Sequence, residues 1–147
     1  MNVYTNFSVT KRFDNLKAAH RQWRHSGHCS KVHGENWAFE VTLSAPRLSK
    51  NNFVRDFGDF KEFRAVLEGF FDHTLLIDAD DPERLYFEEM NAKGLAKVIF
   101  VPSASAEGLA QFVYSHSLSL EMPGVRVTKV VCYEDSKNSA VYESKLD

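Results

Sequence analysis

The chain has 147 residues, of which 44% are hydrophobic and 26% charged, and its formal net charge at pH 7 is −2. This length suits one domain with a substantial core and is too short for two ordinary ones, so we expect residues 1–147 to form a single domain. The small net charge and the lack of a basic cluster argue against nucleic-acid binding. No apolar run approaches the ~20 residues needed to span a bilayer, which argues against a membrane protein.

The first residues and the cysteine content point to the cytoplasm. Residues 1–6 show no basic stretch followed by an apolar one, so a secretory signal is not expected. A reducing compartment would keep Cys29 and Cys132 as free thiols, although a bridge between them is conceivable. Cys132 lies within an apolar, strand-like run and is most simply a buried small residue.

The expected elements, in chain order, are strands, two helices and further strands. Residues 37–43 alternate between apolar and polar types, which predicts a half-buried strand, and residues 125–133 form a second β-rich run. Apolar residues at helical spacing predict helices over 57–71 and 106–116, with Ser105 as the N-cap of the second. Weaker strand candidates are residues 3–11, 97–101 and 140–143.

This order predicts an α+β domain with an antiparallel sheet and two helices. Such a small sheet would leave its edges unpaired, and joining of sheets between subunits would cover them. We therefore expect a homo-oligomer.

A metal site is one way to read His33 and Glu35. Residues two apart in a strand point to the same face, so these side chains can converge on one ion across the small Gly34. His20 is the leading candidate for a third ligand, because two histidines and one glutamate form an established catalytic zinc set. The spacing alone is also explained by a solvated strand start with one hydrogen-bonded histidine, and His28 is a possible substitute if Glu35 does not serve.

Three further segments carry residues suited to proton transfer or ligand binding. Cys29 lies four residues before His33, where a thiolate could accept a proton, although a lone cysteine is more often inert. Asp72 could orient the imidazole of His73 or raise its basicity. Glu134, at the end of a predicted strand, could accept two hydrogen bonds from a guanidine-like N–H pair on a ligand, or simply be a solvated carboxylate.

Taken together and in this order, these segments resemble the family of 6-pyruvoyl- and 6-carboxy-tetrahydropterin synthases along nearly the whole chain. The resemblance includes a first zinc-histidine segment that ends in Ala-Ala-His, a Cys-x-x-x-His-Gly-His motif, an Asp-His pair and a glutamate at a strand end. Here Glu35 stands in place of the last histidine of that motif, and Asp135 stands where the family has a threonine. The six matching segments are residues 13–20, 29–35, 54–61, 71–73, 102–107 and 133–134.

The resemblance implies the tunnelling fold, with a four-stranded antiparallel sheet and two helices in each subunit. The sheets of the subunits join into a ring, a trimer or a dimer of trimers, with active sites between subunits. It further implies Zn²⁺ held by His20, His33 and position 35, and a pterin held by Glu134 with a polar contact from Ser105.

In this family Cys29 would act as the proton acceptor, with Asp72 and His73 as its partners from the same or a neighbouring subunit. The implied reaction converts 7,8-dihydroneopterin triphosphate to 6-carboxy-5,6,7,8-tetrahydropterin, with loss of acetaldehyde and triphosphate, on the route to queuosine and other 7-deazaguanines. The short loop between Cys29 and His33 resembles the carboxy-forming branch. The alternatives are the pyruvoyl-forming synthase and a pterin- or purine-binding homologue whose turnover is impaired by Glu35.

Overall fold

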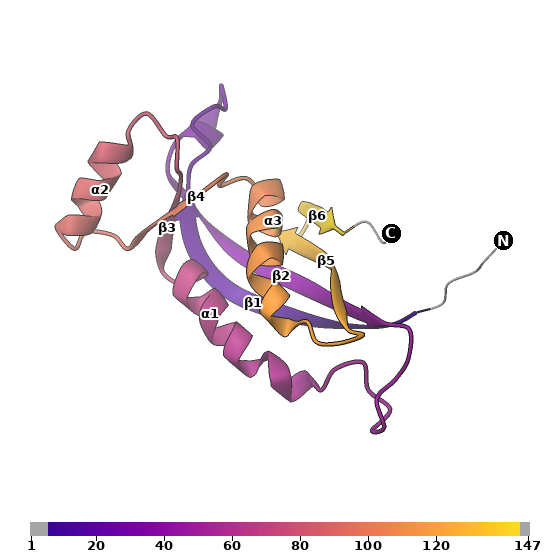
Figure 1. Cartoon of the computed structure of the whole chain (residues 1–147). Helices are drawn as coiled ribbons and strands as arrows, with labels where there is room; N and C mark the ends of the chain where they lie inside the picture. The colour runs from indigo at the N-terminus through magenta and orange to yellow at the C-terminus, as the bar shows by residue number, and fades with distance from the viewer. Residues whose placement is uncertain (1–5, 145–147) are drawn as a thin grey trace.

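The computed structural model describes residues 6–144 as a six-stranded sheet with three α-helices (Figure 1). The order of the strands in the sheet is β4-β3-β1-β2-β5-β6. The strands are β1 (Phe7–His20), β2 (His33–Ala45), β3 (Thr74–Asp78), β4 (Val98–Val101), β5 (Arg126–Tyr133) and β6 (Ser139–Glu143). The helices are α1 (Lys61–Phe71), α2 (Arg84–Ala92) and α3 (Ala106–Ser117).

The sheet is mixed, which corrects the expectation of four antiparallel strands and two helices. β1, β2, β5 and β6 pair antiparallel, but β3 pairs parallel to both β1 and β4. Parallel neighbouring strands cannot be joined by a tight turn, so the chain crosses from β3 to β4 through α2, the helix that was not predicted. β4 confirms the strand candidate 97–101, and β3 and α2, which were not predicted, form one structural unit with it.

Strand β1 is longer than expected, since it continues to His20. The pairing with β2 slips between Phe13 and Leu16, where Asn15 has a φ of +58°. This bulge interrupts the two-residue period, which explains why the alternation does not reveal the second half of the strand. The first residues of the predicted strand 3–11 lie outside the described part of the chain.

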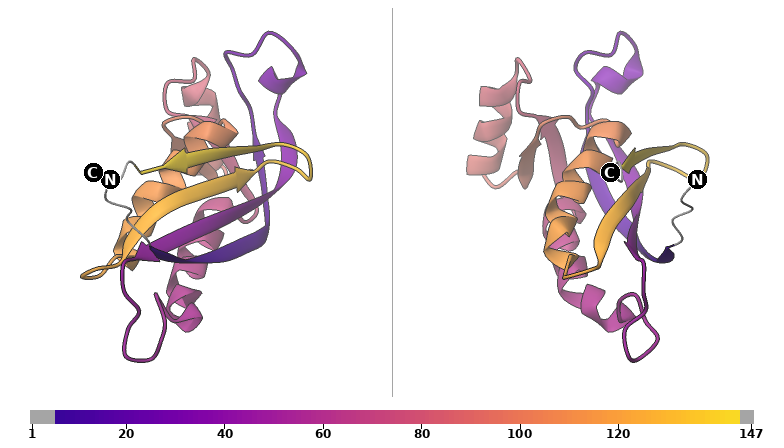
Figure 2. Two further views of the ribbon diagram at one scale, coloured as in Figure 1. Left: turned by 90° about the vertical axis from the view of Figure 1, so that its right-hand side faces the viewer. Right: turned by 45° about the vertical axis from the view of Figure 1, so that its right-hand side comes forward.

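Helices α1 and α3 cover one face of the sheet, and Figure 2 shows α2 lying apart from them. The main core lies between these helices and the strands and is rich in aromatic rings such as Phe13, Phe39 and Phe71. The predicted helix 57–71 begins with a short 3₁₀ turn, Phe57–Phe60, before α1. The predicted helix 106–116 is confirmed as α3, and Ser105 caps it by accepting a hydrogen bond from the Gly108 N–H at 3.0 Å.

Helix α2 forms a second, smaller core on the other side of β3 and β4. Phe87 of α2 packs with Leu75, Ile77 and Val98. In β3 the side chain of Leu76 belongs instead to the main core. The strand is therefore buried on both faces, which explains its continuous apolar sequence.

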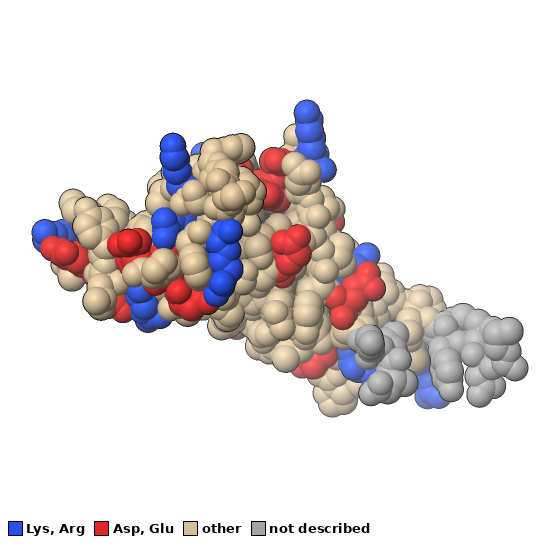
Figure 3. Space-filling view, turned by 90° about the horizontal axis from the view of Figure 1, so that it is seen from above, with Lys and Arg blue, Asp and Glu red and all other residues tan. Residues whose placement is uncertain are grey.

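Charged side chains of both signs are interspersed on the face seen in Figure 3. Within residues 6–144, no helix combines the length and apolar character that a membrane crossing needs.

Replacing Gly108 with alanine is expected to destabilise the fold by about 2 kcal/mol, the usual cost of overpacking. A Cβ at this position would lie 2.5 Å from the backbone carbonyl oxygen of Ser103. The matched control is Gly69→Ala in α1, where a Cβ would have no neighbour within 4 Å and should stabilise the helix by about 0.5–1 kcal/mol. Urea unfolding of the three proteins measures both effects, and equal stability of the two variants would contradict the packing described for α3.

Candidate metal centre and adjoining cavity

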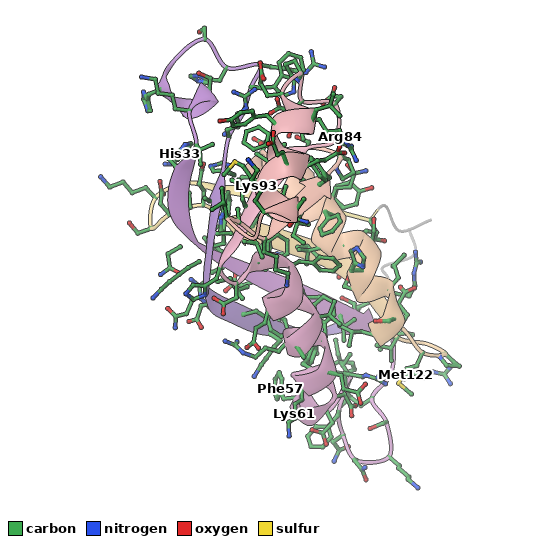
Figure 4. All side chains as sticks on the ribbon, turned by 90° about the vertical axis from the view of Figure 1, so that its left-hand side faces the viewer. His33, Phe57, Lys61, Arg84, Lys93 and Met122 are labelled. Carbon is green, nitrogen blue, oxygen red and sulfur yellow. The ribbon has the colours of Figure 1, made fainter. Side chains whose placement is uncertain are left out.

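Two neighbouring strands bring three of the predicted site residues together at one end of the sheet. His20 ends β1 and pairs with His33, the first residue of β2, while Glu35 lies two residues further along the same face of β2. The Nε2 atoms of His20 and His33 are 3.1 Å apart, and Glu35 Oε1 lies 3.4 Å from His33 Nε2. Figure 4 labels His33 near this end, far from Phe57 and Met122 at the other.

The Nδ1 atoms of His20 and His33 each lie within hydrogen-bond distance of a backbone carbonyl oxygen. Ala104 O is 2.7 Å from His20 Nδ1, and Lys31 O is 2.7 Å from His33 Nδ1. Because a carbonyl only accepts hydrogen bonds, Nδ1 carries the proton in each neutral ring. The two Nε2 lone pairs therefore point into the same space, as in histidines that bind a metal.

Glu134 joins these three residues, a position that the sequence analysis did not predict. It follows the last residue of β5, and its Oε1 lies 3.6 Å from His20 Nε2. One donor atom from each of these four residues lies within 4.8 Å of all the others. We call His20, His33, Glu35 and Glu134 the His–Glu group. His28, on an exposed 3₁₀ turn, is outside the group found among the described residues.

The chemistry and spacing of the His–Glu group fit a divalent metal such as zinc. Ligand atoms bound tetrahedrally at about 2.0–2.1 Å are separated by about 3.3 Å. The closest contacts within the group are 3.1, 3.4 and 3.6 Å, close to that separation. Two imidazole nitrogens with a carboxylate oxygen are, moreover, a known zinc ligand set.

Burial shifts the protonation equilibria of the group toward neutral side chains. It lowers the pKa of His20 and raises the pKa of Glu35. Burial also raises the pKa of Glu134, and repulsion from Glu35 adds to that shift. The lowered pKa of His20 favours the neutral imidazole that a metal requires.

Cys29 lines a cavity of about 370 Å³ together with Glu134 of the His–Glu group. The partly exposed thiol lies in the 3₁₀ turn and borders this cavity together with His25, Glu107 and Glu134. Cys29 and Cys132 are both free thiols, as expected. Cys132 is fully buried, and burial raises the pKa of its thiol.

Asp72 and His73 form the predicted pair, but at a different place. Asp72 Oδ1 is 3.0 Å from His73 Nδ1, and the His73 side chain is 80% exposed. His73 borders a cavity of about 440 Å³ that is also lined by Lys17 and Glu35, so within one chain His73 and Cys29 line different cavities. The φ of His73 is +59°, an uncommon value that is often found at functional sites.

Ser105 borders a third cavity, of about 300 Å³, and not the one beside Cys29. Its hydroxyl already contacts Ser103 Oγ at 2.8 Å and caps α3. His25 borders both cavities, and sequence reasoning gave it no role. In the sequence, the only indication that His25 lies near Cys29 is the interval of four residues between them. The turn that brings both side chains to one cavity is seen only in the structure.

Comparisons with known proteins identify related sequences and structures. The family model described as 6-pyruvoyl tetrahydropterin synthase matches residues 8–145. A 6-carboxy-5,6,7,8-tetrahydropterin synthase from Aquifex aeolicus is 29% identical over 163 residues, covering 95% of this chain and 99% of that protein. The protein of the same name from Haemophilus influenzae is 26% identical over 129 residues, covering 82% and 91% of the two chains.

Solved structures show the same fold. An uncharacterized protein from Wolinella succinogenes superposes with a TM-score of 0.83 at 20% identity, covering 96% of this chain and 99% of that one. The 6-pyruvoyl tetrahydropterin synthase from Plasmodium falciparum superposes with a TM-score of 0.70 at 16% identity, with the same coverage. At these identities the likeness concerns the fold alone, which is the tunnelling fold. From the family match and the curated relatives, the chain belongs to the 6-pyruvoyl tetrahydropterin synthase family and is an enzyme similar to 6-carboxy-tetrahydropterin synthases.

Proposed function

We propose that the protein is a zinc-dependent lyase that converts 7,8-dihydroneopterin triphosphate to 6-carboxy-5,6,7,8-tetrahydropterin, releasing acetaldehyde and triphosphate. The observation that carries the proposal is the convergence of His20, His33 and Glu35 beside a cavity bordered by a free thiol, Cys29. The names of the curated relatives favour the carboxy-forming branch, which serves queuosine and other 7-deazaguanine synthesis.

His20, His33 and Glu35 would hold the zinc. When bound there, zinc supplies a Lewis acid that acidifies the side-chain hydroxyls of the substrate. The carbonyls of Ala104 and Lys31 orient the two imidazoles and fix their tautomers, which pre-organises the ligands. Glu35 brings a negative charge where the resembling family has a third histidine, and this lowers the net positive charge of the site.

Cys29 would take a proton from the substrate across the cavity that it shares with Glu134. Glu134 would accept a hydrogen bond from the pterin in the cavity that it shares with Cys29. Binding of the planar ring by a carboxylate fixes the distance between the reacting side chain and the thiol.

Asp72 and His73 would complete the proton relay from a neighbouring subunit. The position of His73 on a different cavity from Cys29 supports this arrangement, because one chain alone does not bring the imidazole and the thiol to the same cavity. Within the described residues the sheet ends at β4 and β6, which pair with no further strand. A trimer or a dimer of trimers whose sheets join at such edges would unite the site.

The proposal is tested by incubating the zinc-loaded protein with 7,8-dihydroneopterin triphosphate and identifying the products by mass spectrometry. We expect 6-carboxy-tetrahydropterin and acetaldehyde. A pyruvoyl product would move the protein to the other branch of the family. Unchanged substrate with folded, zinc-loaded protein would contradict the proposal, and recovery of turnover by Glu35→His would then favour a binding homologue.

A further inference from the structure

The segment between β1 and β2 carries Cys29 on a short turn that has little packing of its own. The 3₁₀ turn His28–Ser30, which we call the thiol turn, buries none of its residues. It is joined to the end of β1 by a hydrogen bond from the Gln22 N–H to the Cys29 carbonyl oxygen at 2.9 Å. A segment with few buried contacts opens easily. The position of the thiol therefore depends on contacts that other elements make with this segment.

Arg21 connects the thiol turn to the unit β3–α2–β4. Its Nε and Nη2 atoms donate to the two carboxylate oxygens of Asp81, which lies between β3 and α2, and both distances are 2.7 Å. Its Nη1 atom donates to the carbonyl oxygen of Ser30 at 3.4 Å. The guanidinium also lies 5.6 Å from the ring centre of Phe87 in α2. One side chain thus contacts the thiol turn and two parts of the unit β3–α2–β4.

The Arg21–Asp81 pair is held in one geometry. Among the described ion pairs it has the most buried carboxylate, since the Asp81 side chain has no exposed surface. Burial raises the pKa of the Asp81 carboxyl, but hydrogen bonds from Arg21 and from the Glu83 N–H outweigh it and hold the pKa below its usual value. A buried, ionised carboxylate needs its partner in place, and the planar guanidinium binds both oxygens in a fixed arrangement.

A second ion pair between the same two segments is exposed. Arg24 Nη2 donates to Asp80 Oδ2 at 2.7 Å, and both side chains are more than half exposed. Exposed pairs of this kind contribute little, because water competes with the contact and the side chains lose freedom when they form it. The buried pair is therefore the stronger link, and the neighbouring exposed pair offers a matched control.

We propose that Arg21 is a positioning residue for the thiol of Cys29, and that Asp81 of the unit β3–α2–β4 holds Arg21 in place. The inference rests on the proposed function for the role of Cys29 as a proton acceptor. Neither Arg21 nor Asp81 lines the cavity that Cys29 shares with Glu134, so the pair acts through the thiol turn and not on the substrate. The unit β3–α2–β4 thereby supports the site from outside it.

The first test measures how fast iodoacetamide alkylates Cys29, by mass spectrometry, in the wild type, Arg21→Lys, Asp81→Asn and Asp80→Asn. Lysine keeps the positive charge but lacks the fork that binds the carboxylate and the thiol turn together. Arg21→Lys and Asp81→Asn should be alkylated several-fold faster than the wild type, because a released turn exposes the thiol more often. Asp80→Asn removes only the exposed pair and should react like the wild type.

Cys132 provides an internal control in every sample. It is fully buried in the main core and reacts only when the core opens. Faster alkylation of Cys29 with Cys132 still protected therefore reports a local release of the turn. If Asp81→Asn fails to fold, Cys132 reveals it, and Arg21→Lys then decides the question because it keeps a positive charge beside Asp81.

The second test separates kcat from KM for 7,8-dihydroneopterin triphosphate. Arg21→Lys should lower kcat by about 10–100-fold, a loss that a displacement of about 1 Å can cause. KM should change little, because the pair does not line the cavity. A role in stability alone would reduce the amount of folded protein but leave kcat per folded molecule unchanged. The double variant Arg21→Lys/Asp81→Asn should lose no more kcat than the worse single variant, since both residues act through one pair.

Wild-type alkylation rates and wild-type kcat in Arg21→Lys would overturn the positioning role and leave the proposed lyase intact. An effect of Asp80→Asn equal to that of Asp81→Asn would likewise overturn the assignment to the buried pair. A wild type without turnover would instead contradict the proposed function. The alkylation rates need no turnover, so they would still support or overturn the hold of the Arg21–Asp81 pair on the thiol turn.

Discussion

Replacing Cys29 with serine is expected to lower the turnover of 7,8-dihydroneopterin triphosphate by about 10²–10⁴-fold, the usual contribution of a positioned proton acceptor. Serine keeps the shape of the side chain, but its hydroxyl holds its proton far more tightly than a thiol does. The sulfur lies outside the His–Glu group, so zinc affinity should not change. Single-turnover kinetics together with zinc titration measure both quantities.

The control for the Cys29 prediction is Cys132→Ala, which removes the other thiol. Cys132 is fully buried in the main core, away from the cavity beside Cys29. Its loss should reduce stability but leave turnover per folded molecule close to that of the wild type. Retention of more than a tenth of wild-type turnover by Cys29→Ser would contradict the role assigned to the thiol.

Replacing His33 with alanine is expected to lower zinc affinity by more than about 100-fold, because even the loss of a partner behind a ligand costs 10–100-fold. The His33 side chain is 30% exposed, so the fold should tolerate the change better than it would at fully buried His20. Equilibrium dialysis against zinc at fixed pH measures the effect.

His25→Ala is the matched control for His33. His25 also lies near the cavity, but its Nδ1 accepts a hydrogen bond from the Gly27 N–H and it is outside the His–Glu group. Its zinc affinity should equal that of the wild type. A zinc affinity of His33→Ala within a few-fold of the wild type would show that the two strands do not form the metal site.

Local patterns in the sequence predict the antiparallel part of the fold well. Strands 37–43 and 125–133 lie within or overlap β2 and β5, and both predicted helices are present with small changes at their ends. Each of these elements has one buried and one exposed side, so its period is visible in the sequence.

The unit β3–α2–β4 was incompletely predicted for a physical reason. The side chains of Leu75, Leu76 and Ile77 are buried on both faces of β3. A run that is apolar throughout shows no alternation between apolar and polar residues that would identify a strand. α2 buries Phe87 but leaves Leu85 80% and Tyr86 64% exposed, so its apolar residues do not form one stripe. Parallel pairing depends on contacts distant in sequence, which local patterns do not encode.

Some contacts of the candidate site could be predicted from spacing in the sequence, and others depend on the arrangement of the sheet. The spacing of His33 and Glu35 predicts a shared face, and the structure has both side chains within one group of donors. The approach of Glu134 to His20 depends on three adjacent strands, β1, β2 and β5, and no spacing in the sequence reports it. The separation of the Asp72–His73 pair from Cys29 likewise follows from the sheet, and the roles of these residues stay predictions.

The zinc dependence of the activity is tested most directly by titrating zinc into metal-free protein, with bound zinc and turnover of 7,8-dihydroneopterin triphosphate measured on the same samples. Turnover should rise in proportion to bound zinc and level off at about one zinc per His–Glu group, the capacity of a single tetrahedral site. Turnover that is already complete in metal-free protein, or that stays absent when the site is filled, would contradict this zinc dependence.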